Sequence, residues 1–377
     1  MQACTIADSF GGLTGFANMP KTSLEMLAAA SPEDAERWSA LVSRSPMPDV
    51  YYLPAYAQAA SEIEHAEPVA IVAGTDSSKF LAPLLLRRMS AVMNNSRIDW
   101  TDASSPYGYG GLLSLSSSHP TDPRGPRCFL DDLRSWCSDR DLVCCVLRLH
   151  PLLQQEEWFA PEEQKVLRMR FRGTTTAIDL ENWDDARDWP GGMQKDRRSE
   201  LNVARRSLRV TWTSGEDQDA ELNLNRFAEL YEQAMEARHA DSFYRFPSSY
   251  FSRLALLGRH FGIAFAWLDD QLAGASIFLA GRDYAHYHLA CTNEIGMKHK
   301  AATLLIVEGA RWARNQGCKL LHLGGGLNPG DSLEFFKFSF GSRLYRYAYL
   351  IIVADPERFE QLSKIPNAPW PYRSNGT

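Results

Sequence analysis

Hydrophobic positions repeat one arrangement twice along the 377 residues. Apolar runs at residues 68–74 and 80–86 flank a polar turn. The same arrangement returns at residues 261–268 and 272–280, and a third apolar run follows at 284–290. Short apolar runs rich in β-formers around a polar turn are typical of β-hairpins. The pattern therefore predicts one hairpin in the first half of the chain and a three-stranded meander in the second.

Helical patterns surround both predicted hairpins. A helical stretch precedes each hairpin, and a helix and then a strand follow it. The expected helices and strands are residues 31–43, 53–64, 128–140 and 142–149 in the first half and 302–316 and 319–323 in the second. Two copies of one α/β unit explain this order. A chance likeness between two common hairpins is the alternative.

These elements give a domain plan of the α/β (α+β) class. We expect a leader at residues 1–30, a first unit at 31–165, a second unit at 166–360 and a tail at 361–377. Prolines and acidic residues between 150 and 176 indicate a polar connection between the units. A strand at residues 174–180 is expected to open the second unit.

Composition is that of an ordinary globular protein, with 45% apolar and 23% charged residues. The seven cysteines form no CxxC pair and the histidines no HExxH motif, so neither disulfides nor a metal site is predicted. No signal peptide is visible and no apolar run is long enough to span a membrane, so we expect a cytoplasmic protein. The net charge of −6 argues against a general nucleic-acid coat protein but allows a local basic patch.

Four motifs together resemble the FemABX-type peptidyltransferases and their relatives in the acetyltransferase (GNAT) superfamily, over most of residues 45–355. They are Tyr107-Gly108-Tyr109-Gly110-Gly111, preceded by Asp102; the basic residues 195–206; the aromatic residues 227–251; and the stretch from Tyr287-His288-Leu289 through Gly324-Gly325-Gly326 to residues 336–341. The resemblance implies two tandem GNAT-like domains with mixed central sheets flanked by helices. It also implies an enzyme that moves an aminoacyl group from aminoacyl-tRNA to an amine, without a further cofactor.

The same resemblance implies that Lys337 and Phe336 take part in catalysis. An ammonium among aromatic rings is partly desolvated, which strengthens its field on an oxyanion. The ordinary alternative is a buried strand at residues 336–340 from which Lys337 points to solvent. Gly324-Gly325-Gly326 permits close approach of backbone N–H groups to a ligand, or forms a plain turn.

Two further sets of residues are candidates for binding. An acceptor groove is expected to be lined by Asp102, Tyr107, Tyr109, Tyr231, Arg245, Tyr250 and Tyr287. Contacts to tRNA are expected from Arg198, Arg205, Lys298, Lys300 and Arg343. Solvated basic faces and structural turns are the ordinary alternatives for both sets. The aromatic–glycine loop suits a binding floor, and Asp102 suits an amine or its proton.

The sequence departs from the cell-wall branch of the family in two ways. It lacks a long coiled-coil arm, and Phe246 takes the place of the arginine expected beside Tyr250, with Arg245 next to it. The acceptor is therefore a small molecule, a peptide or a cell-wall precursor. In CoA-using relatives a glycine-rich phosphate cradle lies where residues 293–302 contain one glycine. An acyl-CoA-dependent N-acyltransferase and a non-catalytic GNAT-like binding scaffold are the alternative functions, and the oligomeric state stays open.

Overall fold

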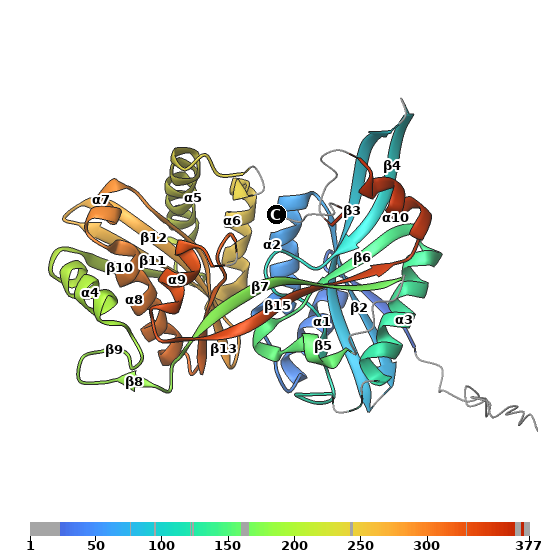
Figure 1. Cartoon of the computed structure of the whole chain (residues 1–377), viewed down its shortest axis with the longest axis horizontal. Coiled ribbons are helices and arrows are strands. Elements are labelled where there is room, and N and C mark those ends of the chain that lie inside the picture. Colours follow the sequence, from blue (N-terminus) through green and yellow to red (C-terminus); the bar gives the residue numbers. More distant parts are fainter. Residues whose placement is uncertain are drawn as a thin grey trace, which may run out of the picture.

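The computed structural model describes residues 23–75, 77–93, 96–120, 122, 124–159, 166–241, 244–328, 330–365 and 371–372. These residues form one long mixed sheet with helices packed on it in two halves (Figure 1). The predicted α/β class with mixed sheets flanked by helices is confirmed. In the described part of the chain, no helix combines the length and apolar character that crossing a bilayer requires.

The first half contains the hairpin and helices that the hydrophobic pattern predicts. Its elements are β1 (Glu25–Ala28), α1 (Pro32–Arg44), η1 (Val50–Tyr52), α2 (Pro54–Glu64), β2 (Glu67–Thr75), β3 (Ser78–Met93), β4 (Ser96–Ser104), β5 (Leu113–Ser114), α3 (Arg124–Asp139), β6 (Leu142–Arg148), η2 (Pro151–Leu153) and η3 (Gln155–Trp158). Ser31 caps α1 through a hydrogen bond from the Asp34 backbone N–H, as its place before a proline predicts.

The second half repeats the arrangement with more helices. Its elements are β7 (Leu167–Asp179), β8 (Trp183–Asp184), β9 (Trp189–Pro190), α4 (Lys195–Ser207), β10 (Arg209–Ser214), α5 (Ala220–Ala237), α6 (Ser248–Leu254), η5 (Ala255–His260), β11 (Phe261–Leu268), β12 (Gln271–Ala280), β13 (Tyr284–Thr292), α7 (Glu294–Lys298), α8 (Ala301–Asn315), β14 (Leu320–Gly324), α9 (Ser332–Phe338), β15 (Ser342–Val353) and α10 (Pro356–Ser363).

The strand order shows that the two halves are related by internal similarity. It runs β1-β2-β3-β4-β6-β15-β7-β14-β13-β12-β11-β10. Read inward from either end, three antiparallel pairings are followed by one parallel pairing, β4 with β6 and β13 with β14. In both halves a helix, α3 or α8, connects the parallel strands. The repeat of one α/β unit is thus visible in the topology.

The two halves are joined at the centre of the sheet by one strand of the second half that also pairs with the first half. The last strand, β15, lies between β6 of the first half and β7 of the second, antiparallel to both (Figure 1). One core cluster also crosses the junction, with Tyr56 of α2 packed among Phe227 of α5 and Tyr250 of α6. The junction between the halves is therefore a built interface, able to hold a site.

Three local expectations differ from the structure. Residues 1–22 of the expected leader lie outside the described residues. Residues 25–28 of it form the strand β1, which pairs with β2. Four residues are too few to show the alternation of apolar and polar positions that predicts a strand. In the expected tail, Tyr372 is buried against Phe359 and donates to Asp102 at 2.9 Å. The strand considered for residues 336–340 is the helix α9 and its end, so that alternative is wrong.

Candidate active site

A groove of about 320 Å³ lies where the two halves meet in the middle of the sheet. Most of its lining residues are aromatic, cationic or glycine, with two threonines and three leucines among them: Tyr51, Tyr107, Gly108, Tyr109, Arg148, Arg172, Thr174, Thr175, Tyr244, Tyr287, His288, His322, Leu323, Gly324, Gly325, Gly326, Leu327, Leu333, Lys337, Tyr347 and Tyr349. Four of the predicted site residues meet there, namely Tyr107, Tyr109, Tyr287 and Lys337.

Lys337 lies in the last turn of α9, and its side chain is directed back to the glycine-rich end of β14. Its Nζ donates a hydrogen bond of 2.7 Å to the carbonyl of Gly325. Burial lowers the pKa of this ammonium to about 8, and Asp331 opposes that shift only in part. An ammonium with a lowered pKa is poorly solvated, so its field on a nearby oxyanion is strong.

The loop from β14 to α9 is held by one carboxylate. Asp331 caps α9 by accepting the Glu334 backbone N–H at 2.8 Å, and it also accepts from Leu327 at 2.7 Å and Asn328 at 3.0 Å. Gly324 has a φ of 73°, and a Cβ there would lie 3.3 Å from the Tyr109 hydroxyl and 3.5 Å from the Lys337 Nζ. Glycine therefore keeps the space between these two polar groups open.

The groove has an aromatic floor that includes the half-buried imidazole of His288. The His288 ring nitrogens interact with the hydroxyls of Tyr51, at 3.1 Å, and Tyr250. Burial lowers the pKa of His288 to about 3, so the imidazole is neutral at physiological pH. Tyr107 packs edge-on against His288 and against Phe246. These packed rings fix the shape of the floor.

Charge in the groove is of one sign. Arg148 and Arg172 each place a guanidinium 5.7 Å from the centre of the Tyr349 ring, and Lys337 adds a third cation. No carboxylate is among the described residues that line the groove. Such a cavity favours a ligand that is anionic or that develops negative charge.

Asp102 does not reach the groove, contrary to the expectation that it holds an amine. Its carboxylate is fully buried at the outer end of β4, where Arg87 binds it through two nitrogens at 2.8 and 2.7 Å. The Tyr372 hydroxyl donates to the same group. These partners make Asp102 a part of the first half's core.

Four other predicted residues lie around the groove but not in its lining. Tyr231 is buried, donates to the Tyr244 carbonyl at 3.0 Å and stacks on Phe246. Tyr250 is buried, and its hydroxyl is hydrogen-bonded to His288, which lines the groove. Arg245 is exposed outside the groove. Phe336 faces α4, where the Arg197 guanidinium lies 5.2 Å from its ring centre. The aromatic neighbour of Lys337 thus packs the helix in place and does not enclose the ammonium.

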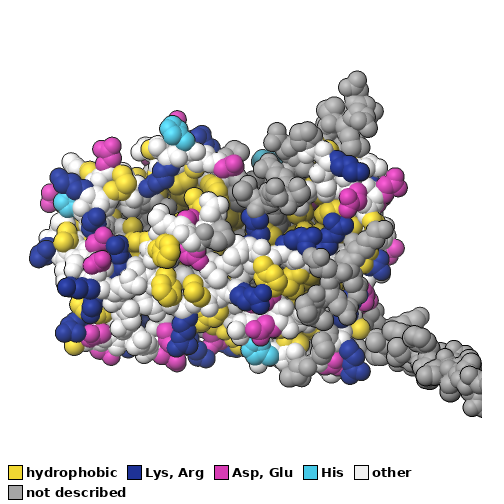
Figure 2. Space-filling model, viewed as in Figure 1, with side chains coloured by type: hydrophobic (Ala, Val, Ile, Leu, Met, Phe, Trp, Pro, Cys, Tyr) yellow, Lys and Arg dark blue, Asp and Glu magenta, His cyan; other side chains and the backbone are white. Residues whose placement is uncertain are grey.

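The predicted tRNA-binding residues are spread over the second half. Arg205 donates to Asp188, Arg343 to Asp179, and Lys300 lies 3.7 Å from Glu200. Arg198 lies over the Trp189 ring, and Lys298 is exposed. Figure 2 shows basic and acidic side chains interspersed on this half of the visible face. The basic stretch of α4 is therefore partly neutralised by its neighbours.

An acidic side chain occupies the start of α8. Glu200 accepts a hydrogen bond of 2.8 Å from the Thr303 hydroxyl in the first turn of this helix. Arg197 also pairs with Glu200. The Lys300 ammonium lies 3.7 Å from the same carboxylate, so two cations offset the charge of Glu200 at the start of α8.

Sequence patterns missed several groove residues. His322 is the middle residue of β14, while Arg148, Tyr347 and Tyr349 lie on β6 and β15. Their signal is weak because single polar residues on alternating strand positions are common on any exposed face. Only the pairing of Tyr349 with Arg148 between β15 and β6 brings them together.

Comparison with known proteins agrees with this geometry. Residues 193–337 match the family model of the acetyltransferase (GNAT) domain. The matched segment is a GNAT domain. It begins just before α4 and ends on Lys337. No curated protein matches the chain in sequence.

Solved structures extend the likeness to both halves. A crystal structure of FemX superposes with a TM-score of 0.65 and 12% identity, covering 86% of this chain and 97% of that one. L-PGS from Bacillus licheniformis gives 0.52 and 11%, covering 86% and 93%. The C-terminal domain of a protein assigned as lysylphosphatidylglycerol synthetase, from Agrobacterium fabrum, gives 0.50 and 14%, covering 87% and 94%. The chain thus has the FemX fold, and the predicted resemblance is confirmed.

Proposed function

We propose that this GNAT-type acyltransferase moves an aminoacyl group from aminoacyl-tRNA to an amine and forms an amide bond in the groove. The observation that carries the proposal is Lys337, whose Nζ lies on a cationic groove wall beside the open backbone at Gly324. The names of the structural relatives support an aminoacyl donor, because a lysylphosphatidylglycerol synthetase joins a lysyl group.

The reaction needs positioning and charge stabilisation more than acid–base chemistry. The amine nitrogen attacks the ester carbonyl, a C–N bond forms and the C–O bond to the ribose breaks. The nitrogen loses a proton and the ribose oxygen gains one. Lys337 would stabilise the negative charge that develops on oxygen, and the tyrosine floor would align the amine.

The segment before α8 favours aminoacyl-tRNA over acyl-CoA as the donor. An acyl-CoA donor would place its pyrophosphate at the N-terminus of α8, where residues 293–302 contain one glycine in place of a glycine-rich cradle. A tRNA presents its ester through a single-stranded end and needs no such cradle. Arg148 and Arg172 in the groove suit the phosphates of that end.

The test compares donors under identical conditions. The protein is incubated with a mixture of aminoacylated tRNAs, or with acetyl-CoA, and with a panel of small-molecule, peptide and cell-wall-precursor amines. We expect an amide product that forms with charged tRNA and disappears after ribonuclease treatment. Product that survives ribonuclease and requires the CoA thioester would overturn the proposal in favour of an N-acyltransferase. No consumption of either donor would support a binding scaffold.

Lys337→Met tests the role of the ammonium. We expect turnover to fall about 10²–10³-fold, the effect of removing one oxyanion donor. Binding of the donor should change far less, because the charge is needed chiefly in the transition state. Lys364→Met, on the exposed end of α10, is the matched control and should keep full activity.

A further inference from the structure

Three buried side chains converge beneath the groove from distant parts of the sequence. Asp49 precedes η1, His150 follows β6, and His286 lies on β13. Each side chain is at most 1% exposed. One ligand atom from each residue lies within 4.8 Å of the others. We propose that these residues bind a divalent first-row transition-metal ion, with Zn²⁺ as the principal candidate.

The spacing of the three groups fits a metal centre. His286 Nε2 lies 2.9 Å and His150 Nε2 3.7 Å from the same oxygen, Asp49 Oδ2. Ligand atoms bound at 2.0–2.2 Å in a tetrahedron lie about 3.3 Å apart, between these two distances. Two imidazoles and one carboxylate are ligands that Zn²⁺ accepts, with a fourth position left for water.

Hydrogen bonding alone leaves part of the cluster unexplained. A simple Asp49–His286 hydrogen bond accounts for the 2.9 Å contact. It does not account for His150, because neither ring nitrogen has a hydrogen-bond partner among the described residues although the ring is fully buried. Leaving such a group unsatisfied is unfavourable, because it loses its hydrogen bonds to water and gains none in the protein. A metal ion would give His150 a partner.

The charge of the cluster also calls for a cation. Asp49 is a buried carboxylate, and no Lys or Arg of the described chain forms an ion pair with it. The Tyr51 backbone N–H donates to its Oδ1 at 3.1 Å, which leaves Oδ2 for the imidazoles. Its ion-pair partners are the two imidazoles, which carry a charge only when they are protonated. Beside neutral imidazoles the buried carboxylate has no opposite charge, which is strongly destabilising, and a bound divalent ion would supply that charge.

Neighbouring groups hold the proposed ligands as outer-shell groups do in metal sites. His286 Nδ1 lies 3.4 Å from His322 Nδ1, so a metal-bound His286 can donate its other N–H there. The His150 backbone N–H donates to Gln155 at 2.8 Å. Asp49 and His150 belong to the first half and His286 to the second. An ion bound by all three would therefore link the two halves below the groove.

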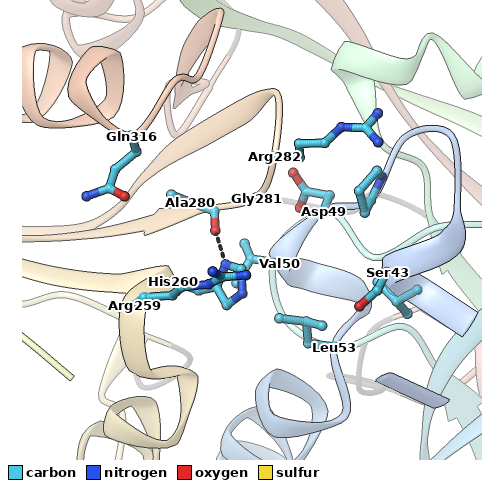
Figure 3. A pocket seen from close by; sticks show the side chains of 12 residues that line it. Ser43, Asp49, Val50, Leu53, Arg259, His260, Ala280, Gly281, Arg282 and Gln316 are labelled. Atoms are coloured by element: carbon cyan, nitrogen blue, oxygen red, sulfur yellow. Dashed lines mark hydrogen bonds between the residues drawn. The ribbon is translucent and has the colours of Figure 1, made fainter. Parts of the chain in front are cut away.

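An access route lies beside the cluster. Asp49 also borders a second cavity of about 370 Å³ between the halves, shown in Figure 3, where its carboxylate lies beside Gly281. Two arginines, Arg259 and Arg282, line the same cavity without an ion pair to Asp49. These positive charges repel a cation, so a metal ion would enter and leave through this cavity slowly. A bound ion should therefore remain with the protein during purification.

Elemental analysis of the full chain, purified without chelator, tests the proposal. We expect about one transition-metal ion per chain, or uptake of one equivalent of added ZnCl₂. Replacement by CoCl₂ should give visible ligand-field bands, and chelator should lower the melting temperature. Purified protein that neither contains nor takes up one equivalent of metal would overturn the proposal.

Variants decide where the ion binds. His150→Gln is expected to lower Zn²⁺ affinity at least 10–100-fold, and its melting temperature should no longer respond to chelator. Asp49→Asn should act in the same way. His260→Gln is the matched control, because His260 lines the second cavity and bonds the Ala280 carbonyl outside the cluster. Full metal content in both cluster variants would show that the metal binds elsewhere.

Discussion

At the scale of single residues, environment separates charges that look alike in the sequence. Lys337 and Asp102 are each a charged residue that the sequence marks as a site candidate. The structure directs Lys337 to the groove through the Gly325 carbonyl, whereas Asp102 is bound on two sides by Arg87 and Tyr372. Tyr372 lies far along the chain from Asp102. Local sequence carries no information about such a partner.

The lowered pKa of Lys337 gives a pH dependence with a definite sign. The ammonium is the form proposed to act, and it is lost as pH rises through about 8. The acceptor amine must also lose its own proton, and it does so equally in a Lys337→Arg variant. We therefore expect the ratio of kcat/KM for the wild-type protein to that for Lys337→Arg to be flat on the acid side of this value. Above it, this ratio should fall about tenfold per pH unit.

A pH–rate profile with one donor and one amine checks this prediction. Lys337→Arg supplies the control, since an arginine stays charged throughout the range. The residual activity of that variant should not fall above pH 8. A ratio of wild-type to Lys337→Arg activity that rises with pH would mean that the neutral amine of Lys337 acts instead.

At the scale of elements, hydrophobic periodicity predicted most of the helices and strands but not α9. The predicted helices at residues 31–43 and 302–316 differ from α1 and α8 by a residue or so at each end. The aromatic positions 336, 338 and 340 alternate as in a strand, yet Asp331 caps a seven-residue helix there. A cap that binds three backbone N–H groups outweighs a weak alternation.

Asp331→Ala tests how far this cap positions Lys337, the proposed catalytic residue. Loss of the cap should cost about 1 kcal/mol of stability. Because α9 is short, the Lys337 ammonium should also lose its fixed place, and we expect turnover to fall about tenfold. Asp331→Asn keeps a capping oxygen and should recover most of both losses. Urea unfolding and turnover measured on the same samples separate the two effects.

At the scale of the whole molecule, the sequence predicted two similar units but not how they are joined. The internal repeat is visible in the apolar runs. The position of β15 between β6 and β7 is not visible there, because a strand of β-branched and aromatic residues can pair equally well with many neighbouring strands. The groove depends on that position, since β15 brings Tyr347 and Tyr349 to it.

Separate expression of the halves tests this interdependence. A fragment of residues 23–165 lacks β15 and should expose the edge of β6, so we expect it to aggregate or remain unfolded. Mixed with residues 166–377 during refolding, it should regain a cooperative thermal transition by circular dichroism. A stable, monomeric 23–165 fragment with its own sharp transition would contradict the prediction.

The late position of β15 has a consequence for how the protein is made. Translation releases β6 and β7 long before the strand that separates them, so the nascent chain carries two open sheet edges until β15 has been synthesised. A chain that stops early would lack one wall of the groove and keep both edges exposed. Incomplete products would therefore be inactive and prone to aggregation, and activity would be confined to chains translated past Val353.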